Sequence, residues 1–236
     1  MKKTCCQHQF VTPCTKKVPI FHSLSEEEMQ KIADMAKHES FQKGSPVVQE
    51  GDSSQTLFIV NKGRVKVSKT TVDGKEQILH LLTCGEFFGE LNLFNGSPSQ
   101  SISVYALEST EICLLRKQDI DQVMEENPNI AFKLLETVTN RLAHTENLVQ
   151  NLATKDPEVR LVHMILEFSE KFGTETEKGI EIDLTLSREE IANYIGVTRE
   201  TISRKLSKFE DLNFITAIGN KQLIVKDIDL LEEYVI

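Results

Sequence analysis

Five cysteines carry the most reactive side chains of this 236-residue chain, and three of them lie close together at the N-terminus. These three are Cys5, Cys6 and Cys14, whereas Cys84 and Cys113 lie far along the chain. In a reducing compartment, clustered thiols favour metal binding or a redox switch over permanent disulfides. The spacing therefore predicts metal or redox chemistry at the N-terminus. The alternative is an inert tail and two buried structural cysteines, which is the role that we expect for Cys84.

A second chemical feature is a short basic stretch in an acidic chain. The chain has a formal net charge of −9, yet four basic side chains stand against Glu200 alone in residues 198–208. If this stretch is helical, Ile202, Leu206 and Phe209 repeat at i, i+4 and i+7 and point into a core. The opposite face then presents Arg199, Glu200, Ser203, Arg204 and Lys208.

That polar face carries the groups that read DNA bases. An arginine such as Arg204 can donate two hydrogen bonds to guanine O6 and N7, and a glutamate such as Glu200 can accept one from cytosine N4. Such residues lie near the start of a recognition helix in the major groove. We expect Lys208 to meet phosphate. The alternative for a lone helix is a solvated face with a Glu200–Arg204 pair.

The elements around this stretch favour DNA binding. Ser187 and Glu190 fit the N-cap and N3 positions of a capping box, and the helix that they start ends at Gly196. A second helix is expected from Thr198 to about Asp211. Further elements are a helix over 159–172, a strand over 180–186 and a hairpin of 214–218 with 222–226. Together they predict a winged helix-turn-helix over 155–236. Thr198 and Ser187, at its helix starts, are further candidate DNA-binding residues.

Glycine-punctuated strands are expected over 21–118. Seven of the 11 glycines fall between Gly44 and Gly96, where they permit tight turns with positive φ. Short β-type runs lie among or after them, at 56–60, 64–70, 76–82, 101–108 and 111–115. This spacing predicts an antiparallel sandwich or roll.

A narrow apolar seam follows the strands, within the helical region 119–154. Its members are spaced alternately four and three residues apart: Ala131, Leu135, Val138, Leu142, Thr145, Val149 and Leu152. Such an a/d pattern is typical of a helix that pairs with another helix. We therefore expect a homodimer. The alternative is that this helix packs on its own sheet domain.

The stretch "LSREEIANYIGVTRETISRKLSKFEDLNFI" resembles the helix-turn-helix of the cyclic-AMP receptor protein/FNR (CRP/FNR) superfamily. The glycine-rich roll and the long helix match the same family, so the resemblance covers nearly the whole chain. It implies an α+β fold with a cyclic-nucleotide-binding-type β-roll, a dimerisation helix and a winged helix-turn-helix. It also implies a transcription regulator that binds a palindromic operator and contacts RNA polymerase.

The resemblance is most specific at "TRETISR". Glu200 and Arg204 match the family residues that read a TGA/TCA core. Ser203 is characteristic of the FNR-like branch, whereas Arg199 matches an arginine of the cyclic-AMP receptor branch. The chain is thus a hybrid, and the outer bases of its half-site stay open.

The stretch "FGELNLFNGSPSQS" resembles the phosphate-binding cassette of nucleotide-binding members. In those members an arginine holds the cyclic phosphate, and here Gln100 stands at that position beside Ser101. A phosphate buried without a cation would cost several kcal/mol. We therefore expect that cyclic AMP is not the effector and that Glu90 belongs to the scaffold.

FNR proteins resemble this chain in their cysteines as well. They hold a 4Fe–4S cluster through three N-terminal cysteines and one in a motif similar to "ALESTEICLL", where Cys113 matches. The N-terminal spacing differs, because adjacent side chains such as Cys5 and Cys6 diverge and do not easily face one cluster. Cys14, one of that pair and Cys113 remain as ligands, and the other cysteine of the pair, His8 or Cys84 are candidates for the fourth.

Two other forms of this chemistry stay open. FNR-like proteins of the Flp type resemble the same layout, and there a thiol–disulfide change between the N-terminus and the sheet domain implies redox sensing without a metal. Zinc bound by cysteines and His8 is the other form.

The remaining sequence excludes several classes. It has no apolar run long enough to span a membrane and no signal-peptide core, so we expect a cytoplasmic protein with an N-terminal arm over 1–20. It has no P-loop, HExxH motif or nucleophile elbow, which argues against an enzyme. The competing functions are an effector-gated regulator whose roll binds a small ligand, and a regulatory subunit of an enzyme.

Overall fold

The computed structural model describes residues 14–96, 99–154, 156–219 and 221–234. They form two compact units: the chain up to Lys69 with Leu79–Ala143, and Thr70–Ile78 with His144–Ile236. Among the described residues, no helix is both long enough and apolar enough to cross a membrane. The expected fold class is confirmed, because the chain contains an antiparallel β-roll, a long helix and a helix-turn-helix with a β-hairpin.

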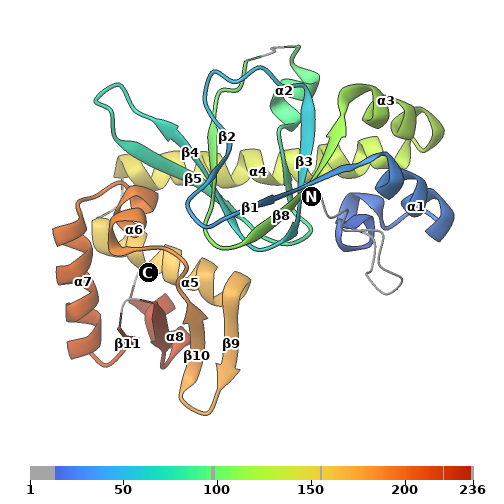
Figure 1. Ribbon diagram of the computed structural model, residues 1–236. Coiled ribbons are helices and arrows are strands. Elements are labelled where there is room, and N and C mark those ends of the chain that lie inside the picture. The colour runs from blue at the N-terminus through green and yellow to red at the C-terminus, as the bar shows by residue number, and fades with distance from the viewer. Residues whose placement is uncertain (1–13, 97–98, 155, 220, 235–236) are drawn as a thin grey trace. The chain divides into compact units, whose positions relative to one another are not determined.

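Two four-stranded sheets make up the β-roll (Figure 1). Their strand orders are β1-β8-β3-β6 and β2-β7-β4-β5. The strands are β1 (Lys37–Phe41), β2 (Pro46–Val48), β3 (Thr56–Lys62), β4 (Val65–Thr70), β5 (Glu76–Leu82), β6 (Phe87–Phe88), β7 (Ser103–Ala106) and β8 (Thr110–Arg116). The β3–β8 and β1–β8 pairs are antiparallel, and both place Cys113 of β8 in their register, opposite Ile59 and His38.

Strands β3 and β8 are buried on both faces, because successive residues of a strand point to opposite sides. In β3, Leu57 and Ile59 enter one apolar cluster, whereas the alternate residues Phe58 and Val60 enter a second. In β8, Cys113 enters the first cluster, and its neighbours along the strand belong to the second. This two-sided burial explains the nearly continuous apolar sequence of both strands.

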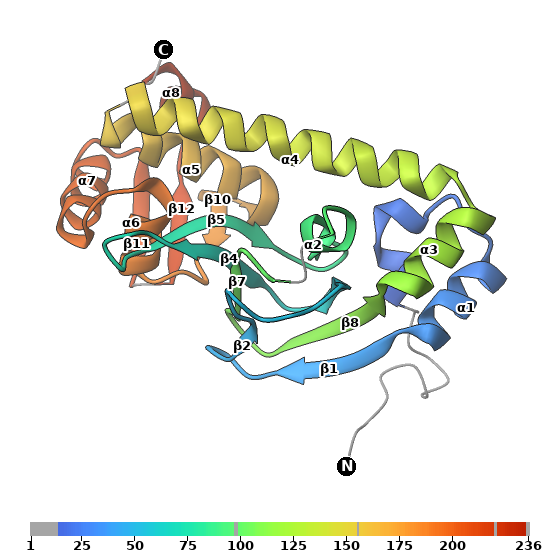
Figure 2. The same ribbon diagram turned by 90° about the horizontal axis from the view of Figure 1, so that it is seen from above.

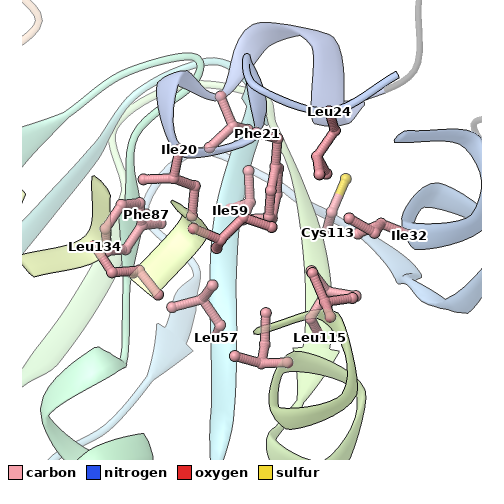
Figure 3. Packing of buried hydrophobic residues seen from close by; sticks show 14 of the residues in the cluster. Ile20, Phe21, Leu24, Ile32, Leu57, Ile59, Phe87, Cys113, Leu115 and Leu134 are labelled. Carbon is pink, nitrogen blue, oxygen red and sulfur yellow. The ribbon is translucent and has the colours of Figure 1, made fainter. Parts of the chain in front are cut away.

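Short helices cover the first cluster. They are the 3₁₀ turns η1 (Cys14–Lys17) and η2 (Pro19–Phe21), with α1 (Glu26–Met35), α2 (Glu90–Phe94) and α3 (Lys117–Glu126). Figure 3 shows Phe21, Leu24 and Ile32 from this N-terminal segment packed against residues of β3 and β8. Figure 2 shows α1 beside α3.

The N-terminal segment approaches the sheet very closely at Gly85. This glycine has a φ of +90°, and a Cβ atom there would lie 2.2 Å from the carbonyl oxygen of Lys17. Only glycine tolerates both the left-handed backbone and the contact. The turn before β6 is therefore fitted to the segment that follows Cys14.

The long helix α4 (Asn129–Thr154) runs unbroken for 26 residues (Figure 2). Its apolar seam is largely exposed in the single chain: Leu135 is 63%, Leu142 58% and Val149 61% exposed. Val138 and Thr145 are half-buried, and the side chain of Leu152 lies outside the described residues. Contiguous exposed apolar side chains of this kind mark interaction surfaces.

The C-terminal unit has its own sheet, of order β11-β12-β10-β9. Its elements are α5 (Pro157–Phe172), β9 (Gly173–Thr176), β10 (Gly179–Asp183), α6 (Arg188–Ile195), α7 (Arg199–Asp211), β11 (Ile215–Ile218), β12 (Gln222–Val225) and α8 (Ile228–Glu233). Gly196 ends α6 in the left-handed conformation, which directs the chain into α7. The helix pair and hairpin match the sequence prediction.

Candidate nucleic-acid interface and sensor site

Helix α7 is oriented by its cap and by its apolar face. The hydroxyl of Thr198 accepts a hydrogen bond from the backbone N–H of Thr201, so Thr198 is the N-cap of α7. Ile202, Leu206 and Phe209 are each at most 3% exposed. The sequence prediction of the buried face is therefore confirmed, and it leaves the opposite face for solvent.

The exposed face of α7 carries Arg199, Glu200, Ser203 and Arg204. All four lie in the first half of the helix, as base-reading residues of a recognition helix do. Ser187, the other candidate at a helix start, caps α6: its Oγ accepts from the N–H of Glu190, whose carboxylate in turn accepts from the N–H of Ser187. The predicted capping box is present.

Lys208, the last predicted DNA contact of α7, has partners inside the protein. Its ammonium and that of Lys205 both donate to the carboxylate of Glu158, near the start of α5. The hydroxyl of Tyr234 donates to the same carboxylate. Burial raises the pKa of Glu158, but these three hydrogen bonds outweigh it and lower the pKa to about 2. Hydrogen bonding to Glu158 raises the pKa of Lys208.

A second polar cluster joins α4, α5 and α6 within the C-terminal unit. The hydroxyl of Tyr194 donates to Glu167, with distances of 2.9 and 3.0 Å to the two carboxylate oxygens. His144 Nε2 lies 3.6 Å from Glu167 Oε1. The hydrogen bond with Glu167 raises the pKa of His144. Burial raises the pKa of Glu167, but His144 and Tyr194 lower it overall.

In the β-roll, a cation from α4 binds the start of the phosphate-binding-type cassette, residues 88–101. Glu90 is 8% exposed, and its Oε1 lies 3.1 Å from Nη1 of Arg141. The Arg141 guanidinium also donates to the carbonyl oxygen of Phe87 and lies 4.7 Å from the centroid of that ring. Gly89, directly before Glu90, has a φ of +90°, and a Cβ atom there would lie 2.4 Å from the carbonyl oxygen of Thr56.

Gln100 stands where the cassette would need a cation. It is 2% exposed, and its Nε2 donates to the carbonyl oxygen of Ser54 at 3.2 Å. Its Oε1 and the Oε2 of Glu90 are buried acceptors without a hydrogen-bond partner in the described part of the chain. The cassette thus offers two acceptor oxygens. They suit a ligand that donates hydrogen bonds better than a phosphate, whose oxygens are themselves acceptors.

Cys113 is fully buried in the first apolar cluster. Its Sγ lies 3.2 Å from Nδ1 of His38 on the neighbouring strand. Figure 3 shows this sulfur on the side of Leu24 and Ile32, under the N-terminal segment. Cys84 is exposed, so the expectation that it is buried was wrong. Its thiol donates to the carbonyl oxygen of Asn61, and residues 84 and 85 form a turn.

The N-terminal cysteines lie largely outside the structure. Cys5, Cys6 and His8 fall in residues 1–13, and Cys14 begins η1 with its side chain outside the described residues. Within the described residues no cluster of three or more His, Cys, Asp or Glu side chains is arranged to hold a metal ion. The structure therefore places Cys113 beside His38 and leaves the other candidate ligands as predictions.

Three residues of these sites were not predicted from the sequence: His38, Arg141 and Glu158. Each acts through a partner 47 or more residues away, so no local pattern indicates the contact. The signals present were weak: Arg141 precedes the seam residue Leu142, and Glu158 is an acid in the first turn of a helix.

Comparisons with known proteins give the class of this architecture. The model of the cyclic nucleotide-binding domain family matches residues 38–127, and that of the Crp-like helix-turn-helix domain family matches residues 159–234. The cAMP-activated global transcriptional regulator CRP of Salmonella typhimurium is 34% identical over 182 residues, covering 77% of this chain and 85% of the relative. The global nitrogen regulator of Nostoc sp. is 30% identical over 198 residues, covering 83% and 88%.

A solved structure shows the same fold. A mutant of CooA from Carboxydothermus hydrogenoformans matches with a TM-score of 0.77 and 23% identity, covering 90% of this chain and 93% of the other. A cyclic-nucleotide-binding-type roll and a Crp-like helix-turn-helix in one chain define a DNA-binding transcription regulator. This chain belongs to the CRP/FNR family of transcription regulators. Its assignment to the FNR-like branch stays a prediction.

The ion pair of Arg141 and Glu90 should stabilise the roll. We expect Arg141→Met to lower the free energy of unfolding by about 2–4 kcal/mol, because it leaves the Glu90 carboxylate buried without a cation. The double variant Arg141→Met/Glu90→Gln should lose less than the sum of the single losses, by about 1–3 kcal/mol. Urea unfolding of the three variants and wild type measures this coupling. Strictly additive losses would contradict it.

Proposed function

We propose that this regulator acts as a homodimer, reads a palindrome with a TGA/TCA core through α7 and responds to redox state through Cys113. The observation that carries the DNA-binding part is the exposed face of α7, where Glu200, Ser203 and Arg204 project from a helix anchored by its apolar side. These are the residue types that bind cytosine and guanine edges in the major groove. Arg199 extends the same face and would contact the outer bases or phosphate.

Arg204→Ala should abolish sequence-specific binding, because each half-site loses a bidentate contact worth about 1–3 kcal/mol. Fluorescence anisotropy with a TGA/TCA palindrome and with a scrambled duplex measures the discrimination. Lys178→Ala is the matched control, since it removes one exposed positive charge at the turn between β9 and β10. If Arg204→Ala distinguishes the two duplexes as well as wild type does, α7 is not the reading helix.

The exposed seam of α4 supports the homodimer. Three apolar side chains, each more than half exposed, recur along one face of the helix, and a partner helix would bury them. A palindromic operator requires the same twofold symmetry, because each subunit then reads one half-site.

We expect Leu142→Glu to shift the protein toward monomer, because it would place like charges opposite each other at the centre of the seam. Asn140→Glu introduces the same charge on the same helix away from the seam and should leave the dimer intact. Sedimentation equilibrium at micromolar concentrations distinguishes the two results. A dimer that survives Leu142→Glu unchanged would remove α4 as the pairing surface.

The redox part of the proposal is supported by the contact between Cys113 and His38. The Nδ1 atom, 3.2 Å from Sγ, can accept the thiol proton, and the thiolate is the reactive form. A 4Fe–4S cluster needs four ligands, and the described residues bring only Cys113 and His38 together. A disulfide needs one thiol besides Cys113, whereas a cluster or a zinc ion needs several further ligands, so we propose the thiol–disulfide form.

The corresponding reaction is disulfide formation between Cys113 and Cys14, Cys5 or Cys6. Two thiols lose their protons and two electrons, a sulfur–sulfur bond forms, and a peroxide accepts the electrons and is reduced to water. Because Cys113 is fully buried, the reaction requires the covering segment with Leu24 and Ile32 to move. Oxidation is thereby coupled to a rearrangement of the roll.

Peroxide should change the affinity of the wild-type protein for the palindrome by about tenfold, which is a typical coupling between two sites. It should also remove two free thiols from each subunit. Cys113→Ser should abolish both changes, whereas Cys84→Ser should respond like wild type because Cys84 is not part of the proposed disulfide. Thiol counts, iron and zinc contents and anisotropy are measured on anaerobically purified protein. A wild-type response in Cys113→Ser would contradict the redox proposal.

An effector-gated regulator is the second candidate function. It is favoured by the two buried acceptors of the cassette, Glu90 Oε2 and Gln100 Oε1, which a small ligand with hydrogen-bond donors would satisfy. In that case regulation would persist after alanine replaces all four candidate cysteines. As a regulator of this family, the protein would also be cytoplasmic and contact RNA polymerase, which are expectations from the family resemblance.

A further inference from the structure

The start of α5 carries a carboxylate enclosed by cations of the reading helix. Glu158 is 8% exposed and accepts hydrogen bonds from Lys205 and Lys208 of α7 and from Tyr234 at the end of α8. A second carboxylate, that of Asp156, caps the same helix and lies 3.8 Å from the ammonium of Lys205. Two of the four basic residues of α7 are therefore paired inside the protein.

The donor set around Glu158 has the composition of a phosphate site. Such a site combines a helix N-terminus, where backbone dipoles favour an anion, with lysines and a hydroxyl. Here α5 supplies the helix N-terminus, α7 the two ammonium groups and Tyr234 the hydroxyl. The anion in it is a side chain of the protein itself.

The ring contacts of Tyr234 fix this arrangement on the apolar side. The ring packs edge-on against Phe209 of α7 at 5.8 Å and against Phe214 at 5.3 Å between centroids. The ammonium of Lys208 lies 5.5 Å from the centroid of the same ring. The lysine is therefore held by a carboxylate, a hydroxyl and an aromatic face at once.

We infer that Glu158 acts as an internal substitute for a DNA phosphate, which neutralises Lys205 and Lys208 and thereby restrains non-specific DNA binding. Phosphate contacts supply most of the non-specific affinity of a DNA-binding protein, since each one releases counterions. With both lysines occupied, attraction to any duplex falls, whereas base reading by Arg204 and Glu200 is unaffected. Glu158 thus determines specificity without touching a base. This inference rests on the proposed reading role of α7, and it revises the expectation that Lys208 is a plain phosphate contact.

The test compares the salt dependence of binding to a scrambled duplex by anisotropy, using the full-length protein. Glu158→Gln should release the two lysines, raise affinity for the scrambled duplex roughly tenfold at 0.1 M salt and steepen the slope of log K against log salt by about 1–2. Glu175→Gln removes the same charge at an exposed position of β9 and should change neither quantity.

A triple variant keeps the inference testable if Glu158→Gln fails to fold. Replacing Glu158, Lys205 and Lys208 all by glutamine removes the anion and both cations together, and it should reproduce the wild-type salt slope. A slope lower by about 2 in the triple variant would show that the lysines contact phosphate in the wild type, and it would overturn the inference.

Two further outcomes decide the question. A wild-type slope in folded Glu158→Gln, or an equal rise in Glu175→Gln, would also overturn the inference. Failure of the proposed function is distinguishable, because it appears as a lack of discrimination between palindrome and scrambled duplex in the wild type, whatever the salt slopes.

Discussion

The two-sided burial of β3 and β8 is the constraint on which the sensor part of this protein depends. A strand that is buried on both faces must fill two apolar clusters with alternate residues, so a slip of its register by one position would place each set in the wrong cluster. That register places Cys113 beside His38. It also aligns β6 along β3, which stacks Phe88 on Phe58 with centroids 4.8 Å apart and sets the start of the cassette. The candidate thiol and the start of the cassette therefore both lie on strands of one sheet, the sheet that contains β3 and β8.

Within each unit, carboxylates hold helices in place through polar contacts. Glu90 holds Arg141 of α4, Glu158 holds the lysines of α7, and Glu167 holds His144 and Tyr194. Removing one member of such a group leaves a poorly solvated charge, which costs far more than an exposed pair contributes. Each carboxylate thus specifies the position of a helix that the apolar contacts alone would orient less strictly. The helices concerned are those that carry the seam and the reading face.

Local patterns were sufficient to predict the fold class and most elements of the C-terminal unit. The capping box at Ser187, the glycine turn at Gly196 and the apolar repeat of α7 are local patterns. Each depends only on residues that are close together in the sequence, so the sequence alone locates it. Helix α1 was not predicted, and α3 was not separated from α4 within the predicted helical region 119–154, because a helix of ten residues gives only a short periodic pattern. The partners of Cys113, Arg141 and Lys208 were not predicted either, because each contact joins chain segments that only folding brings together. For the same reason, the sequence could suggest Lys208 as a phosphate contact but could not show that a carboxylate already holds it.

The junction of α4 with α5 and α6 has a consequence for proton binding. The hydrogen bond with Glu167 raises the pKa of His144 above its ordinary value of 6.5, so the folded chain binds this proton more tightly than the unfolded chain does. The stabilisation from this proton is complete below pH 6.5 and disappears as the pH rises through the folded-state value. Deprotonation of His144 as the pH rises therefore weakens the attachment of this part of α4 to α5 and α6, with no ligand and no change in sulfur chemistry.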